Sequence, residues 1–170
     1  MKAWMALPIL ILAACSTYSP SAAPSPLTGD PLPISMEESR AFWTEHTFTC
    51  EEPVPASDAP LQRVHCVADY STFDEGVLVV DYIGDGCAVH SVVASMDLRS
   101  VKDPDLQLEL AQGFLGVTVP ELLGSAVDVE AIGNWIRPKL GGGDASALVG
   151  GFRVEITSAD GVPSVRISAG

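Results

Sequence analysis

The chain of 170 residues has an apolar fraction of 47% and a formal net charge of −13, which indicates one acidic globular domain and no membrane-spanning protein. This acidity argues against binding to nucleic acid or to an anionic lipid surface, because both require a basic patch. The motifs of serine nucleophiles, zinc proteases and phosphate-binding loops are absent, so the sequence predicts no enzyme and no cofactor.

The start of the chain is typical of an export signal. A positive Met1-Lys2 precedes an apolar run and the small residues before Cys15. The stretch Leu12-Ala13-Ala14-Cys15 resembles the lipobox of bacterial lipoproteins, in which the Cys is acylated on its sulfur and becomes the first mature residue. The resemblance implies a signal peptide over residues 1–14 and a lipid anchor at Cys15, although an ordinary signal cleaved after Ala14 is an alternative. Because Ser16 is not the Asp that resembles an inner-membrane retention signal, we expect the outer membrane, facing the periplasm, in a host with two membranes.

Residues 15–33 are rich in Pro and Ser and predict a lipid-anchored tether. Residues 34–170 have the size of one domain, and we expect a single one. Once Lys2 leaves with the signal peptide, 8 basic residues remain against 22 acidic ones, a formal charge of −14.

The domain is predicted to be α+β, with a short N-terminal helix, a four-stranded antiparallel meander, two helices and a C-terminal β-hairpin. Ser35 and Glu38 form a capping-box pattern at the start of the first helix. The meander is predicted from residues 46–50, 64–70, 77–83 and 87–96. Its expected register pairs Cys50 with Cys66, Tyr70 with Val77, and Ile83 with Cys87.

Local signals also mark the later elements. Asp103 is the expected N-cap of a helix that ends near Gly116, and Asp128 is the expected N-cap of the next helix. An Asp160-Gly161 turn predicts a hairpin that pairs Ile156 with Val165, Val154 with Ile167, and Glu155 with Arg166.

The predicted register assigns the meander residues to two faces. Helices are expected to cover the face that carries the cysteines, Val79, Asp81 and Val93. The other face is expected to be a mixed apolar and polar binding surface, unless the C-terminal hairpin covers it. Its candidate residues are His65, Tyr82, His90 and Met96.

The cysteines suggest a disulfide. A hairpin folded about Asp58 brings Cys50 opposite Cys66, although pairings with Cys87 stay open. Each His lies near a Cys, as in zinc sites, but the predicted register divides them between two faces, so no metal site is expected. Cys87 is expected to be a small buried apolar residue. Asp81 is expected at the sheet edge or held by backbone donors, with a general acid as the alternative.

These patterns favour a non-catalytic envelope lipoprotein whose domain binds another envelope protein. The alternative is a carrier or sensor of a small apolar ligand held between the sheet and the helices of residues 106–135. An enzyme would require Asp81 or Cys87 in a cleft beside a second reactive group.

Overall fold

The structure is a computed structural model that describes residues 30–56, 61–70, 76–125 and 127–170. The predicted signal peptide, Cys15, most of the tether and the turn about Asp58 lie outside these residues.

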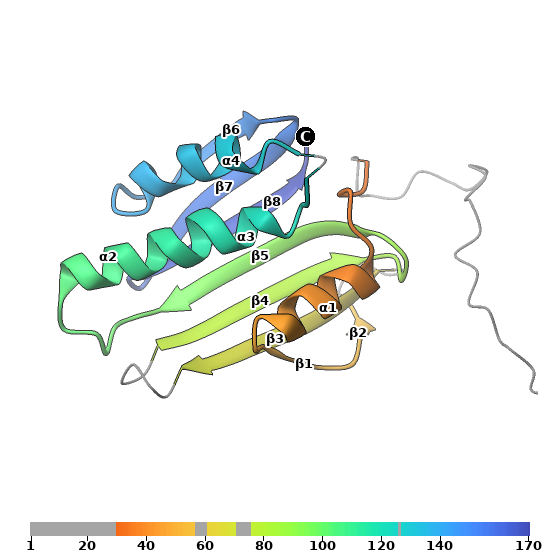
Figure 1. The fold of residues 1–170 in the computed structure, drawn as a ribbon, viewed down its shortest axis with the longest axis horizontal. Helices are drawn as coiled ribbons and strands as arrows, with labels where there is room; N and C mark the ends of the chain where they lie inside the picture. The colour runs from red at the N-terminus through yellow and green to blue at the C-terminus, as the bar shows by residue number, and fades with distance from the viewer. Residues whose placement is uncertain (1–29, 57–60, 71–75, 126) are drawn as a thin grey trace, which may run out of the picture.

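The fold has two layers, an antiparallel sheet and a layer of helices on one of its faces (Figure 1). The helices are α1 (Met36–Glu45), α2 (Pro104–Gly113), the short α3 (Val119–Glu121) and α4 (Val129–Ile136). The sheet has the strand order β1-β3-β4-β5-β8-β7-β6, and β2 also pairs with β3. Its strands are β1 (Thr49–Cys50), β2 (Val54–Pro55), β3 (Gln62–Tyr70), β4 (Gly76–Gly84), β5 (Val89–Asp97), β6 (Ala145–Val149), β7 (Phe152–Ala159) and β8 (Val162–Ala169).

The predicted α+β class is confirmed, but the predicted division into a four-stranded meander and a separate hairpin is wrong. The hairpin of β7 and β8 extends the same sheet, because β8 pairs with β5 in the register Ala94↔Val165. Two strands were also missed. β2 is only two residues long, and β6 follows three glycines that predicted a break.

The strand register is confirmed at one point and corrected at two. Cys50 lies opposite Cys66 as predicted. Tyr70 pairs with Gly76 and not with Val77, a shift of one residue that turns β3 over relative to β4. Ile83 pairs with Ser91 and not with Cys87, and the register is irregular between Ile83 and Gly84.

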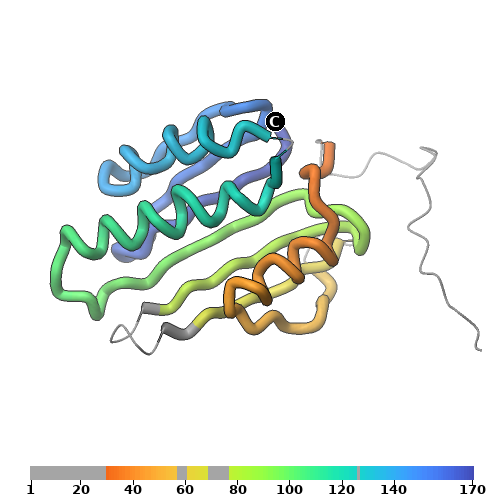
Figure 2. The backbone as a smooth tube through the Cα atoms, in the orientation of Figure 1, coloured from red at the N-terminus to blue at the C-terminus, as the bar shows by residue number. Residues whose placement is uncertain are grey.

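The corrected register places one apolar set under the helices. Val64, Cys66, Val80 and Val92 are among the buried strand residues, and they pack against helix residues such as Ile132. Leu32, two residues before the expected start of the domain, is also buried, and its N–H donates to the Val89 carbonyl. Figure 2 shows this N-terminal segment passing beside the turn between β4 and β5 before it enters α1.

The helix starts follow the predicted caps. Ser35 and Glu38 form the capping box, and the Asp103 carboxylate accepts from the backbone N–H groups of Asp105 and Leu106. The Asp128 side chain likewise accepts from Ala131 at the start of α4. The helix from Pro104 does not end at Gly116 as predicted. It continues through a π-helical segment, η1 (Phe114–Thr118), into α3, and α4 is followed by the 3₁₀ turn η2 (Arg137–Lys139).

Candidate functional site

The sheet face opposite the helices is uncovered by any described element. We call it the open face. It carries alternate residues of the central strands: Arg63, His65, Val67, Val77, Val79, Asp81, Ile83, Ser91, Val93, Ser95, Ser164, Arg166 and Ser168. Because strand residues alternate between faces, this assignment follows directly from the pairing.

The middle of the open face is apolar although nothing described covers it. Val67 of β3 lies directly opposite Val79 of β4. Val93 of β5 lies opposite Asp81, the next residue of β4 on the same face. Val67, Val79, Ile83 and Val93 are half-buried, because each is shielded only by its neighbours on the same face. The result is a strip of β-branched side chains with serines on one side of it, a composition suited to contact with another surface.

A polar group lies beside this strip. His65 and Asp81 are direct cross-strand partners, and the His65 Nδ1 lies 3.0 Å from the Asp81 Oδ1. The Arg63 Nε lies 3.8 Å from the same oxygen. The His65 and Asp81 side chains are 30% and 28% exposed, so water reaches the pair. Because the Asp81 carboxylate accepts, the Nδ1–H of His65 is the donor of this hydrogen bond, and the bond orients the imidazole ring at the surface.

The open face also differs in charge from the helices. The helices α1, α2 and α4 contain one basic residue, Arg40, against six acidic residues, namely Glu37, Glu38, Glu45, Asp105, Glu109 and Glu130. On the sheet side, Arg63 and Arg166 are exposed and are balanced by Asp81 and Glu155, with 3.9 Å between the Arg166 Nε and the Glu155 Oε2. The register also places Arg153 and Asp97 on this face, so the basic and acidic residues named here balance and the open face is close to neutral in a strongly acidic chain.

The predicted binding residues do not form one surface. Tyr82 and Met96 are buried under the helices, whereas His65 lies on the open face. His90 lies in β5, directly after the turn that follows β4, and its Nε2 is 3.4 Å from the Asp85 Oδ2. The one-residue shift between β3 and β4 is the cause, because it moves Tyr82 to the face opposite His65. Conversely, Val79 and Val93, which were expected under the helices, lie on the open face with His65.

The two candidate reactive residues, Asp81 and Cys87, do not lie where they were expected. Asp81 lies in the middle of the sheet on the open face and is held by His65 and Arg63, not at a sheet edge or by backbone donors. Cys87 is exposed at the turn after β4 and is not buried as expected.

The turn between β4 and β5 is held by a carboxylate. Asp85 Oδ1 accepts from the backbone N–H groups of Cys87 and Ala88. Burial acts to raise the pKa of Asp85, but these two donors and His90 outweigh it and hold the pKa below its ordinary value. The carboxylate is thus the favoured state of this turn.

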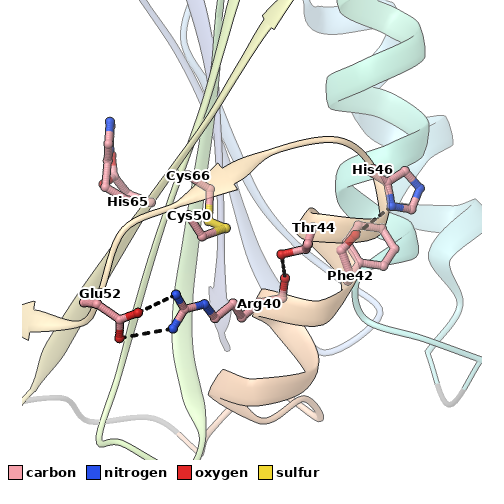
Figure 3. Close-up of a disulfide and its surroundings, with 9 residues drawn as sticks. Arg40, Phe42, Thr44, His46, Cys50, Glu52, His65 and Cys66 are labelled. Atoms are coloured by element: carbon pink, nitrogen blue, oxygen red, sulfur yellow. Dashed lines mark hydrogen bonds and ion pairs between the residues drawn. A yellow bond between two sulfur atoms is a disulfide. The ribbon is translucent and has the colours of Figure 1, made fainter.

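The predicted disulfide between Cys50 and Cys66 is confirmed. It joins β1 to β3 on the helix-covered face, and Figure 3 shows His65 projecting from the other side of β3. The bidentate pair of Arg40 and Glu52 lies near it and ties α1 to the chain after β1. A hydrogen bond from Arg40 lowers the pKa of Glu52.

Three buried polar atoms lie between α1 and the sheet. The Ser39 hydroxyl, the Trp43 indole N–H and the Tyr82 hydroxyl have no hydrogen-bond partner among the described residues. Burial raises the pKa of Tyr82 to about 12. The phenol is therefore neutral over the whole physiological range.

The described ranges contain no candidate metal site and no helix that could cross a membrane. Within them, no group of three or more His, Cys, Asp or Glu side chains converges as metal ligands would. None of the helices in these ranges combines the length and the apolar composition that crossing a bilayer requires.

A shallow groove of about 440 Å³ lies at one end of the sheet. It is lined by the N-terminal segment, the start of α4 and the turn between β6 and β7, including Pro31, Asp128, Gly150 and Phe152. The space between the sheet and the helices, where the predicted apolar ligand would sit, contains the fully buried side chains of Leu115, Ile132 and Ile136.

Comparisons with models of protein families, with curated protein sequences and with solved structures find no match to this chain.

Proposed function

We propose that the protein is a non-catalytic envelope lipoprotein, anchored through Cys15, whose domain binds another envelope protein through the open face. The observation that carries the proposal is the strip of half-buried Val67, Val79 and Val93 in the middle of an uncovered sheet face. Apolar surface of this kind gains free energy when a partner removes it from water, at about 25 cal/mol per Å².

Charge indicates which partner surface fits. Exposed Arg63 and Arg166 lie beside the apolar strip, and their contacts of 3.8 and 3.9 Å with Asp81 and Glu155 are too long to be hydrogen bonds. Their guanidinium donors could therefore bind carboxylates of a partner. The acidic helices would repel the same partner. We therefore propose a folded partner with an apolar patch bordered by acidic residues, which docks on the sheet side and not on the helix side.

The packing of the interior favours this proposal over a carrier of a small apolar ligand. Leu115, Ile132 and Ile136 occupy the space between sheet and helices, whereas the groove lies at the end of the sheet. A carrier would need a hollow of several hundred Å³ lined by those helix residues.

Arginine substitutions on the two faces test the proposal. Val77 on the open face and Leu106 on α2 are matched in exposure, at 40% and 39%. The lipidated protein would be purified from its own envelope in mild detergent, and bound polypeptides would be identified by native mass spectrometry. We expect a stoichiometric second polypeptide with the unmodified protein and with Leu106→Arg, and its loss in Val77→Arg and Val79→Arg. Loss in Leu106→Arg with retention in both Val variants would contradict the proposal, as would the absence of a second polypeptide from the unmodified protein.

A further inference from the structure

We propose that the edge strand β6 pairs with β6 of a second copy of this chain, so that the two sheets become continuous across a twofold axis. In the strand order of the sheet, β6 is terminal, and in the described part of the chain it pairs with β7 alone. Its outer edge therefore offers backbone donors and acceptors for strand addition. Leu148 in this strand is 69% exposed.

The two edges of the sheet differ in their protection. At the opposite edge, β1 and β2 are two residues long each, Pro53 and Pro55 cannot donate, and the disulfide fixes the chain. β6 is five residues long and contains neither a charged residue nor a proline. Edge strands of monomers ordinarily carry such obstacles to pairing, and β6 lacks them.

The sequence around β6 fits an identical strand. Glycines stand near both ends of it, at Gly141–Gly143 before and at Gly150 and Gly151 after, and Asp144 is the one residue with a side chain between these glycines and the strand. Antiparallel pairing centred on Ala147 would set Leu148 opposite Ser146 of the second copy. The two Leu148 side chains would then be diagonal neighbours on the same face, within reach of each other.

The distribution of charge favours this edge over the rest of the surface as the contact between two copies. Each mature chain has a formal charge of −14, with 8 basic against 22 acidic residues, so two copies repel over most of their surfaces. In the proposed register, Asp144 faces Gly150 of the second copy and not another acid. Its Oδ1 already accepts from the Ser158 N–H within its own chain. The pairing thus brings the edges of two acidic chains together without setting Asp144 opposite another acid.

Lysine substitutions test this pairing, because the proposed register makes each substituted residue the diagonal neighbour of its own copy and so places two like charges beside each other across the new strand pair. The full lipidated chain in mild detergent would be measured by sedimentation velocity and native mass spectrometry over a wide concentration range. We expect a dimer that Leu148→Lys and Ser146→Lys weaken by about tenfold or more in dissociation constant. Val54→Lys is the matched control, since Val54 is 42% exposed at the opposite edge, and it should leave the dimer intact.

Two results would overturn the proposal. One is a monomer at every concentration of the unmodified chain. The other is a dimer that persists in both β6 variants, which would show association through the lipid or another surface. The open-face variants Val77→Arg and Val79→Arg should keep the dimer, so that failure of this proposal is separate from failure of the proposed function.

Discussion

Gly133 of α4 packs directly on the backbone of Gly116 in η1, and a Cβ at Gly133 would lie 2.4 Å from the Gly116 carbonyl oxygen. No side chain can move aside to relieve this contact, because the neighbouring atom belongs to the backbone. The π-helical segment and α4 therefore approach each other as closely as they do because position 133 is glycine.

Gly133→Ala should destabilise the domain by about 2 kcal/mol, since the added methyl group forces the two helical segments apart. Gly113→Ala is the matched control, because a Cβ at Gly113 at the end of α2 meets nothing within 4 Å. That variant should gain up to about 1 kcal/mol from the higher helix propensity of Ala. Urea unfolding of both variants measures the difference, and equal stabilities would contradict the described packing.

Reduction of the disulfide should also destabilise the domain. Cys50 and Cys66 are 16 residues apart, and closing a loop of that size lowers the entropy of the unfolded chain. This stabilises the folded state by about 3 kcal/mol. We expect a lower urea midpoint in the presence of a reductant. The double variant Cys50→Ala/Cys66→Ala should not respond to the reductant, and an equal response would place the redox effect elsewhere, for example at Cys87.

Because of the Tyr82 hydroxyl, we expect the stability of the folded domain to fall at alkaline pH. Burial raises its pKa from 10.0 to about 12, so the folded state holds the proton more tightly than the unfolded chain does. Its contribution to stability is complete below pH 10.0 and is lost as the pH rises toward 12. Tyr82→Phe should lose this dependence in urea unfolding at a series of pH values.

The same variant tests whether the hydroxyl is unsatisfied. Because the Tyr82 oxygen has no hydrogen-bond partner among the described residues, Tyr82→Phe should be neutral or more stable by about 1 kcal/mol at pH 7. A loss of about 1 kcal/mol or more would reveal a hydrogen bond at this oxygen.

For Asp85 we expect the free energy of unfolding to depend on pH in the acid range, in the direction opposite to that for Tyr82. Backbone donors and His90 outweigh burial and hold its pKa below the ordinary 3.8, so its contribution is present above that value and is lost as the pH falls through the lower, folded pKa. Asp85→Ala should cost about 1 kcal/mol at pH 7, a modest amount because the side chain is 48% exposed. Urea unfolding should show the difference from the unmodified protein shrinking below pH 3.8. A difference that stays constant with pH would contradict this role for the carboxylate.

Elements with local signals could be predicted from the sequence. The hairpin of β7 and β8 has its turn at Asp160 and Gly161, both with positive φ, and pairs Ile156 with Val165 as expected. The helix caps at Ser35, Asp103 and Asp128, and the disulfide, were likewise predicted correctly. The caps and the turn are each marked by residues a few positions apart, whereas the disulfide was predicted from the pairing of two strands whose cysteines are 16 residues apart.

Long-range pairing could not be predicted in this way. The contact of β5 with β8 joins segments about 70 residues apart and leaves no local mark. β4 is a run of β-branched and apolar residues on both faces, so its composition does not identify the buried face. An error of one residue in the predicted pairing of β3 with β4 therefore assigned Tyr82 to the face of His65, and Val79 and Asp81 to the face under the helices.

Site-specific photocrosslinking in the cell tests the central claim most directly. A photoreactive side chain would replace Val79 on the open face or, as the control, Leu106 on the exposed side of α2. The account predicts one crosslinked product of defined mass from position 79, containing this chain and a second, different protein, and none from position 106. Products from position 106 alone, or from neither position, would contradict the assignment of the open face as the protein-binding surface.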